Sequence, residues 1–223
     1  MDIIKAEKLE KIYQDNGVPV HALRGIDLNV SKGEYIVIAG PSGSGKTTLL
    51  NLLGALDKPS SGRIFFENED ITEKPKDFLS NMRLHKLGFI FQAYNLIPVL
   101  SAIENIEFSM MLLGIPEKER KDKALELMDE LGIKELADKR PNEMSGGQQQ
   151  RVAVARAIVN NPSVVLADEP TANLDSTTAG HLLELMQRMN SEKNITFIFS
   201  SHDKQVIDQA KRLLILKDGK IQD

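Results

Sequence analysis

Three short runs of consecutive apolar residues stand out along the chain: Tyr35 to Ala39, Val164 to Ala167, and Ile195 to Phe199. Each run is rich in β-branched or aromatic residues, which is typical of strands buried on both faces of a helix-covered parallel sheet. Mixed apolar and polar runs instead predict half-exposed strands near the N-terminus: Ile3 to Tyr13, Ala22 to Val30, and Arg63 to Glu67.

Helical periodicity becomes prominent in the second half of the chain. From Ala124 to Leu131 the apolar residues recur at helical spacing within the segment Glu117 to Leu131. We expect residues from about 93 to 145 to form a helical subdomain inserted in one α/β domain, whose core comprises residues 1–92 and 146–223. The core then continues with helices at Gln148 to Val159 and Thr177 to Met189.

Polar or small residues follow each of the three buried strands. The first strand leads into a glycine-rich loop, the second into Asp168 and Glu169, and the third into Ser200, Ser201 and His202. In open α/β sheets, ligands bind beyond the carboxyl ends of the strands. We therefore expect these three groups to converge at one edge of the sheet.

The glycine-rich loop fits the phosphate-loop pattern G-x-x-x-x-G-K-[ST] with these residues: Gly40, Pro41, Ser42, Gly43, Ser44, Gly45, Lys46 and Thr47. Glycines let backbone N–H groups wrap a phosphate chain, and the following helix adds a favourable dipole. Lys46 is expected to bridge the β- and γ-phosphates, Thr47 to bind Mg²⁺, and Thr48 to reach the α-phosphate. A plain glycine-rich turn is disfavoured by the flanking strand and helix.

The residues after the second and third strands suit phosphoryl-transfer chemistry. Asp168 is expected to hold Mg²⁺ through water, and Glu169 to orient or deprotonate the attacking water. The alternative for this pair is a solvated acidic turn before Pro170. His202 could contact the γ-phosphate, although a lone histidine is more often structural.

Three further features each allow two roles when only their residue types are considered. The segment Ser145-Gly146-Gly147-Gln148 is expected to begin a helix. Its role could be simply to cap that helix, or it could form a second anion site. Tyr13 could belong to the core or stack on adenine. Gln92 could be a hinge residue or could reach Mg²⁺ or the attacking water.

Composition and charge narrow the possible environments. The 223 residues include no cysteine and carry a formal net charge of −4. The absence of cysteine excludes disulfides and cysteine metal sites. The negative net charge argues against binding to nucleic acid or directly to anionic lipid. No signal peptide and no run of about 18 apolar residues is present. We expect a cytoplasmic protein that only a partner would hold at a membrane.

Taken together, these motifs resemble the nucleotide-binding subunit of an ATP-binding-cassette (ABC) transporter, over essentially the entire chain. The resemblance implies a phosphate-loop NTPase fold with a mixed, largely parallel sheet, an N-terminal antiparallel β subdomain and the helical insertion. It implies that Ser145-Gly146-Gly147 caps the ATP of a second subunit, in a head-to-tail dimer around two ATP molecules. Asp175 would then link the two sites, and Tyr13 would stack on adenine. ATP and Mg²⁺ are the expected cofactors.

The same resemblance points to one branch, that of the lipoprotein-releasing, macrolide-exporting and cell-division ATPases. An integral membrane permease would hold the subunit at the inner face of the membrane, with contacts at Tyr94 to Leu96. Small departures from the family pattern, at Met144, Asn173 and Ser201, remove no catalytic group. A DNA-repair-type ATPase is disfavoured because no long coiled coil is inserted, and a translation-type ATPase because only one cassette is present. The alternative that stays open is a cell-division-type ATPase that regulates its partner without transporting a substrate.

Overall fold

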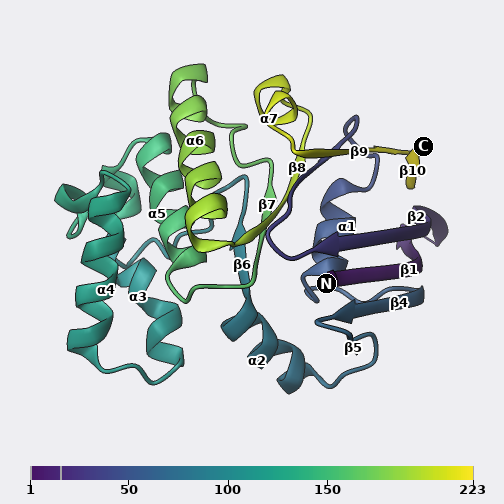
Figure 1. Cartoon of the computed structure of the whole chain (residues 1–223), viewed down its shortest axis with the longest axis horizontal. Coiled ribbons are helices and arrows are strands. Elements are labelled where there is room, and N and C mark those ends of the chain that lie inside the picture. Colours follow the sequence, from purple (N-terminus) through teal and green to yellow (C-terminus); the bar gives the residue numbers. More distant parts are fainter. Residues whose placement is uncertain (1, 16, 223) are drawn as a thin grey trace.

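The computed structural model describes residues 2–15 and 17–222, and within them the strands form two sheets (Figure 1). The larger sheet has the strand order β10-β9-β3-β8-β7-β6. Its strands are β3 (Tyr35–Ala39), β6 (Leu87–Ile90), β7 (Val164–Asp168), β8 (Thr196–Ser201), β9 (Arg212–Lys217) and β10 (Lys220–Gln222). All neighbours pair in parallel except β10, which is antiparallel to β9. The three predicted buried strands are thus adjacent in the middle of this sheet.

Both faces of the larger sheet are buried, and successive side chains of a strand point to opposite faces. On β3, Tyr35 and Val37 pack with the helices of one layer. Ile36 and Ile38 pack on the other face, against helix α1 (Lys46–Leu53) and the smaller sheet. Burial on both faces explains why this strand is a continuous apolar run rather than an alternating one.

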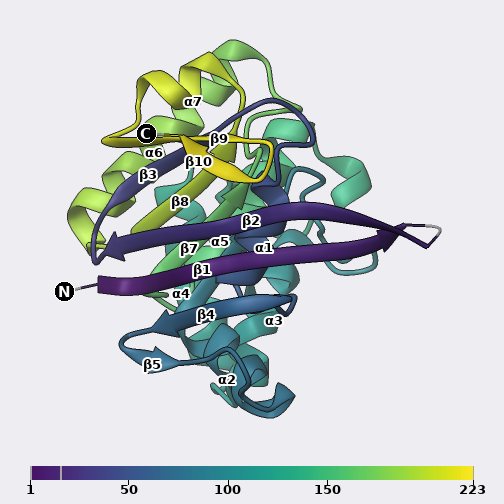
Figure 2. The same ribbon diagram turned by 90° about the vertical axis from the view of Figure 1, so that its right-hand side faces the viewer.

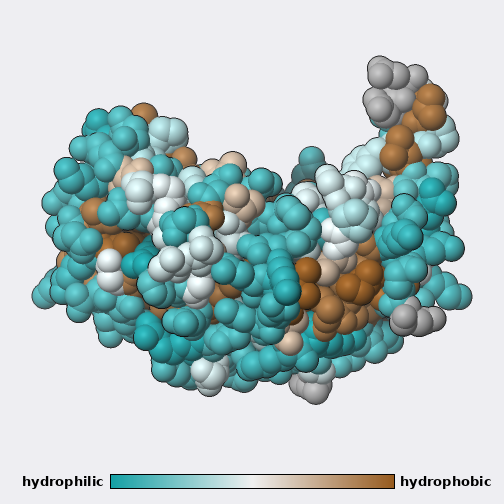
Figure 3. Space-filling view, turned by 90° about the horizontal axis from the view of Figure 1, so that it is seen from above, coloured by the Kyte–Doolittle hydropathy of each residue, from teal (hydrophilic) through white to brown (hydrophobic). Residues whose placement is uncertain are grey.

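The smaller sheet is antiparallel, in the order β2-β1-β4-β5, as expected for the N-terminal β subdomain. Its strands are β1 (Asp2–Asp15), β2 (Val18–Ser31), β4 (Ser61–Phe66) and β5 (Glu69–Asp70). The first two form a long hairpin whose end extends past β4 (Figure 2) and projects at the upper right of Figure 3. Both strands are longer than the sequence predicts, because exposed residues such as Val18 and Val20 continue the pairing beyond the buried part.

Helices cover both faces of the larger sheet. α1 lies between the two sheets, while α3 (Ala102–Leu112), α4 (Glu117–Glu130), α5 (Gly146–Ile158) and α6 (Ser176–Lys193) lie on the opposite side (Figure 1). The remaining helices are α2 (Lys76–Lys86), α7 (Lys204–Asp208) and the 3₁₀ turns η1 (Lys134–Leu136) and η2 (Pro141–Glu143). In the described part of the chain, none of the helices is long and apolar enough to cross a bilayer.

The segment between β6 and α5 is helical, as the sequence predicts, and it contains α3, α4, η1 and η2. Ser101 begins α3 with a reciprocal capping box, in which its side chain accepts from the Glu104 N–H and the Glu104 carboxylate accepts from the Ser101 N–H. The buried side chain of Asn105 then holds the preceding loop through four hydrogen bonds, to Ile97, Leu100 and Ser101. The chain thus leaves β6 through a fixed loop.

Candidate active site

The carboxyl ends of β3, β7 and β8 meet beside the β1–β2 hairpin, and a pocket of about 460 Å³ opens there. Figure 3 shows the molecule hollowed between its helical part and the projecting hairpin. Ten of the residues singled out in the sequence line this pocket: Tyr13, Ser42, Gly43, Gly45, Lys46, Thr47, Thr48, Gln92, Glu169 and His202. The expected convergence of groups far apart in sequence is therefore confirmed.

The glycine-rich loop has the backbone that its sequence requires. Gly43 and Gly45 adopt positive φ angles of 77° and 104°, a region that favours glycine. A Cβ at Gly40 would lie 2.1 Å from the Leu216 carbonyl oxygen and 2.8 Å from Ser44 Oγ. The loop therefore packs so closely against β9 that residue 40 has no room for a side chain. Pro41 and Ser44 close the turn, with the Ser44 N–H donating to the Pro41 carbonyl at 3.2 Å.

Lys46, in the first turn of α1, points its ammonium group into the centre of this loop. Its Nζ donates to the carbonyl oxygens of Gly40 at 2.8 Å and Pro41 at 3.1 Å, and lies 3.7 Å from Glu169 Oε1. The side chain is only 8% exposed. A buried cation next to a glycine-rich loop and a helix N-terminus is suited to hold an anion such as a phosphate group.

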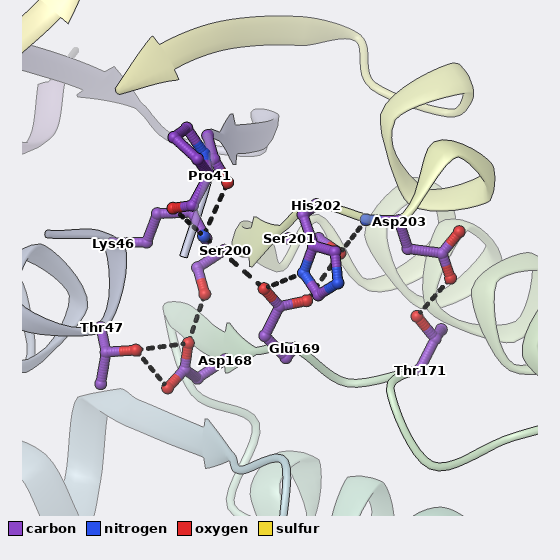
Figure 4. Close-up of polar contacts among 11 residues, drawn as sticks. Pro41, Lys46, Thr47, Asp168, Glu169, Thr171, Ser200, Ser201, His202 and Asp203 are labelled. Atoms are coloured by element: carbon purple, nitrogen blue, oxygen red, sulfur yellow. Dashed lines mark hydrogen bonds and ion pairs between the residues drawn. The ribbon is translucent and has the colours of Figure 1, made fainter. Parts of the chain in front are cut away.

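Thr47 and Asp168 lie together on the other side of the loop (Figure 4). Thr47 Oγ1 donates to Asp168, 2.9 Å from Oδ2 and 3.1 Å from Oδ1. Ser200 Oγ also donates to Asp168 Oδ1. A hydroxyl and a carboxylate in direct contact supply the oxygen ligands that Mg²⁺ prefers, so these residues fit the expected ion.

Glu169 is held by its backbone and by both of its carboxylate oxygens. Its φ angle is +45°, which is unfavourable for a residue with a side chain, and its N–H donates to the Ser200 carbonyl at 2.9 Å. Oε1 lies 2.8 Å from His202 Nδ1, and Oε2 accepts from Ser201 Oγ at 3.0 Å. The Glu169 side chain is 13% exposed, whereas that of His202 is 69% exposed.

Tyr13 forms one wall of the pocket, where the hairpin begins to project. Its hydroxyl donates to Asp57 Oδ2 at 2.9 Å, and Lys11 Nζ lies 4.8 Å from the ring centroid while bonding Asp57 Oδ1 at 2.8 Å. Partial burial raises the pKa of Tyr13, and the hydrogen bond to Asp57 adds to the rise. Because the ring is 37% exposed and lines the pocket, it is not a core residue.

Gln92 lies in the loop after β6, separated from the strand by Phe91, and is exposed at the pocket. Its carbonyl oxygen accepts from Asn173 Nδ2 at 2.8 Å. The next residues, Tyr94 and Asn95, have left-handed φ angles of 60° and 49°, and their carbonyl oxygens accept from the Arg156 guanidinium. The loop is thus tied both to the segment before α6 and to α5.

The segment Ser145-Gly146-Gly147-Gln148 does not line this pocket. It lines a separate, smaller pocket of about 350 Å³ together with Asp175. Ser145 caps α5 in a reciprocal capping box with Gln148, at 3.3 and 2.9 Å. Gly146 lies against the hydroxyl of Tyr94, where a Cβ would come within 2.7 Å. The predicted N-cap is confirmed, and the helix begins at Gly146, two residues before the predicted start.

Asp175 caps α6, which begins at Ser176 rather than Thr177. It accepts from the backbone N–H groups of Thr177 and Thr178 and from the Thr178 hydroxyl. The hydrogen bonds from Thr178 lower the pKa of Asp175, so the carboxylate stays ionised. Ser145 and Asp175 thus share one polar edge, distinct from the phosphate-loop pocket of the same chain.

Sequence reasoning assigned no supporting role to the residues that hold the side chains of the site in place. Asp57 and Lys11 hold Tyr13, while Ser200 and Ser201 hold Asp168 and Glu169. The two serines carried a signal, because they end a buried strand next to His202. Asp57 carried none, since its partner Tyr13 lies 44 residues away in sequence.

The fold and the pocket define a phosphate-loop nucleotide-binding protein. Comparison with known proteins makes this class more specific, because a family model described as ABC transporter matches residues 23–172. The chain therefore belongs to the ATP-binding cassette family of ABC transporters.

Individual relatives agree with this assignment. The lipoprotein-releasing system ATP-binding protein of Idiomarina loihiensis is 43% identical over 217 residues, which cover 97% of this chain and 95% of that protein. The macrolide export ATP-binding/permease protein of Syntrophobacter fumaroxidans is 42% identical over 224 residues, and the aligned part is only 31% of that longer protein. Both belong to the branch that the sequence resembles.

A cassette of Methanocaldococcus jannaschii has been solved in a dimeric structure with a TM-score of 0.93 and 40% identity, covering 99% of this chain and 97% of that one. A dimeric post-hydrolysis state of the same cassette holds ADP and phosphate, also with a TM-score of 0.93, at 39% identity. As a member of this family, the chain is an ATP-binding and ATP-hydrolysing subunit of an ABC transport system.

Proposed function

We propose that the phosphate loop binds the triphosphate of Mg²⁺-ATP and that the residues around it divide the work. Lys46 neutralises charge on the β- and γ-phosphates, and the N–H groups of the loop and of the α1 N-terminus surround them. Thr47 and Asp168 would hold Mg²⁺, which would offset negative charge on the phosphates. The single observation that carries this assignment is the placement of Lys46, Thr47 and Glu169 around one pocket.

Glu169 acts as the general base for the attacking water. The water gives a proton to the carboxylate, its oxygen bonds to the γ-phosphorus, and the bond from that phosphorus to the β–γ bridging oxygen breaks, which releases ADP. Glu169 is well placed for this step because its largely buried carboxylate lies 3.7 Å from the Lys46 ammonium, the group that would hold the γ-phosphate. His202, exposed beside it, then contacts the γ-phosphate.

Two copies complete each other's sites. Ser145, Gly146 and Gly147 lie at a separate edge from the phosphate loop, so one copy cannot place them on its own nucleotide. In a head-to-tail dimer they would cap the ATP of the second copy, with Asp175 beside them. Tyr13 stacks on adenine, and Gln92 reaches the ion or the water. The solved dimers of a similar cassette support this arrangement.

A membrane permease is the further partner. The exposed apolar side chains that support docking are Leu56, Val99 in the loop before α3, and Phe108, Met111 and Leu112 on α3. A neighbouring pocket is lined by Phe89, Phe91, Asn95 and Arg156, next to Tyr94 and Leu96. The helical segment 93–145 would move as a subdomain and carry the nucleotide state from Gln92 to this surface. The subunit would thus lie on the cytoplasmic face of the membrane and drive lipoprotein release or export, as its relatives' names favour over division control.

The replacement Glu169→Gln tests the hydrolytic assignment. It keeps the shape and hydrogen bonding of the side chain but removes the base, so turnover should fall by about 10² or more. Steady-state phosphate release measures this, with Glu192→Gln, an exposed change on α6, as the matched control. Turnover near that of the wild type would remove Glu169 from this role.

A further inference from the structure

The two carboxylate oxygens of Glu169 have different surroundings. Oε1 faces the pocket, 2.8 Å from His202 Nδ1 and 3.7 Å from Lys46 Nζ. Oε2 faces the interior and accepts from Ser201 Oγ at 3.0 Å. Figure 4 draws the contacts of one carboxylate oxygen with His202 and Lys46 and of the other with Ser201. Oε1 thus contacts two residues that line the pocket, one of them the exposed His202, whereas Oε2 contacts a buried serine.

The hydroxyl of Ser201 has little freedom to point elsewhere. Ser201 is fully buried, and its Oγ accepts from the Asp203 N–H at 3.0 Å. With that lone pair occupied and no solvent access, its single proton is directed to Glu169. Asp203 is fixed in turn, because its carboxylate accepts from Thr171 Oγ1 at 2.9 Å and from the Gln205 N–H at 2.9 Å.

These contacts close a ring between the ends of β7 and β8. Thr171 lies two residues after Glu169 in the chain, so the path runs from Thr171 to Asp203, to Ser201 and back to Glu169. The ring does not include His202, whose side chain is 69% exposed. The hold on Oε2 therefore persists when His202 turns away from Oε1.

We propose that Ser201 is a positioning residue for hydrolysis: it anchors Glu169 Oε2 through the Thr171–Asp203 ring, so that Oε1 receives the proton of the attacking water. This rests on the role of Glu169 as general base. Ser201 is fully buried and does not line the pocket; it acts by preventing the carboxylate from rotating. Nucleotide binding, which uses the phosphate loop, does not depend on it.

The test compares Ser201→Ala with a buried hydroxyl at the other end of the same strand. Thr196 is fully buried, and its Oγ1 accepts from the Gly33 N–H at 2.9 Å, so Thr196→Val also loses a buried hydrogen bond but lies at the start of β8. We expect Ser201→Ala to lower kcat by about tenfold or more, because a misplaced reacting group is costly. Its KM for ATP should stay within about twofold of the wild type, since binding does not involve the serine.

Conservative variants separate positioning from folding. Ser201→Thr keeps the donor and should retain kcat within about threefold, whereas Ser201→Cys keeps the shape with a weak donor and should lose most of it. The cysteine variant also serves if Ser201→Ala does not fold. Thr196→Val should lower the melting temperature without lowering kcat.

Two results would overturn the proposal: a kcat of Ser201→Ala and Ser201→Cys equal to that of the wild type, or an equal loss in Thr196→Val. Glu169→Gln, measured in parallel, distinguishes failure of the base role of Glu169 from failure of the positioning role of Ser201. If it remains active, the base assignment itself fails. If it is inactive and Ser201→Ala is fully active, only the positioning fails. In the Glu169→Gln background, Ser201→Ala should cause no further loss.

Discussion

Replacing Tyr13 by alanine tests whether the pocket selects adenine. Lys11 Nζ occupies one side of the ring at 4.8 Å and Asp57 holds the hydroxyl, so only the face towards the pocket is open to a base. Stacking of a base on an aromatic ring contributes about 1–3 kcal/mol. With one open face on a ring that is 37% exposed, we take the lower part of that range, about 1–2 kcal/mol. This corresponds to an increase of about 5- to 30-fold in the Kd for ATP.

Isothermal titration calorimetry with Mg²⁺-ATP and with Mg²⁺-tripolyphosphate separates the base from the phosphates. Tyr13→Ala should weaken ATP binding by the stated factor and leave tripolyphosphate binding unchanged. Tyr13→Phe keeps the ring and serves as the matched control. An equal loss for both ligands, or no loss for ATP, would refute the stacking role and the reasoning from ring geometry.

Two further predictions concern stability. The Tyr35 hydroxyl is buried with no hydrogen-bond partner among the described residues, and burial raises its pKa. Removing this hydroxyl in Tyr35→Phe should therefore leave the free energy of unfolding unchanged or raise it by up to about 1 kcal/mol, as measured by urea unfolding at pH 7. The wild type should also lose stability as the pH rises above about 10, where the phenol ionises in the unfolded chain only, and Tyr35→Phe should lose less over the same range. Asn105→Leu should cost about 2–4 kcal/mol in urea unfolding, because it leaves backbone groups of residues 97–101 without their four hydrogen bonds; a cost below that of an exposed control, Asn142→Leu, would contradict this.

The sequence predicted the three central strands of the larger sheet, and the meeting of polar residues beyond them, because both depend on local patterns. A short apolar run that ends in a polar group marks a buried parallel strand and its ligand edge, and β3, β7 and β8 fit that rule. The phosphate loop is equally local, since its glycines must accommodate positive φ angles and a close approach to Leu216.

Other features depend on tertiary structure and could not be predicted in this way. The length of the β1–β2 hairpin is set by pairing between exposed residues, which have no apolar pattern. β9 was not predicted, and its burial does not follow its apolar pattern: Leu216 is fully buried, whereas Leu213 and Ile215 are exposed. The supports of Tyr13 and Glu169 come from Asp57 and Ser201, whose hydrogen bonds join positions 44 and 32 residues apart.

If the phosphate-loop pocket is half of a site that a second copy completes, ATP should bring two copies together through Ser145. Gel filtration of Glu169→Gln with and without Mg²⁺-ATP, compared with the double variant Glu169→Gln/Ser145→Arg, measures this. Arginine at position 145 places a long charged side chain on the edge that would cap the other copy's nucleotide. Ser191→Arg in the same background is the control, because Ser191 lies near the far end of α6.

We predict that Glu169→Gln and its Ser191→Arg control elute as dimers only when ATP is present. The Ser145→Arg double variant should remain monomeric while still binding ATP in calorimetry. An ATP-dependent dimer of the Ser145→Arg double variant would contradict the shared site.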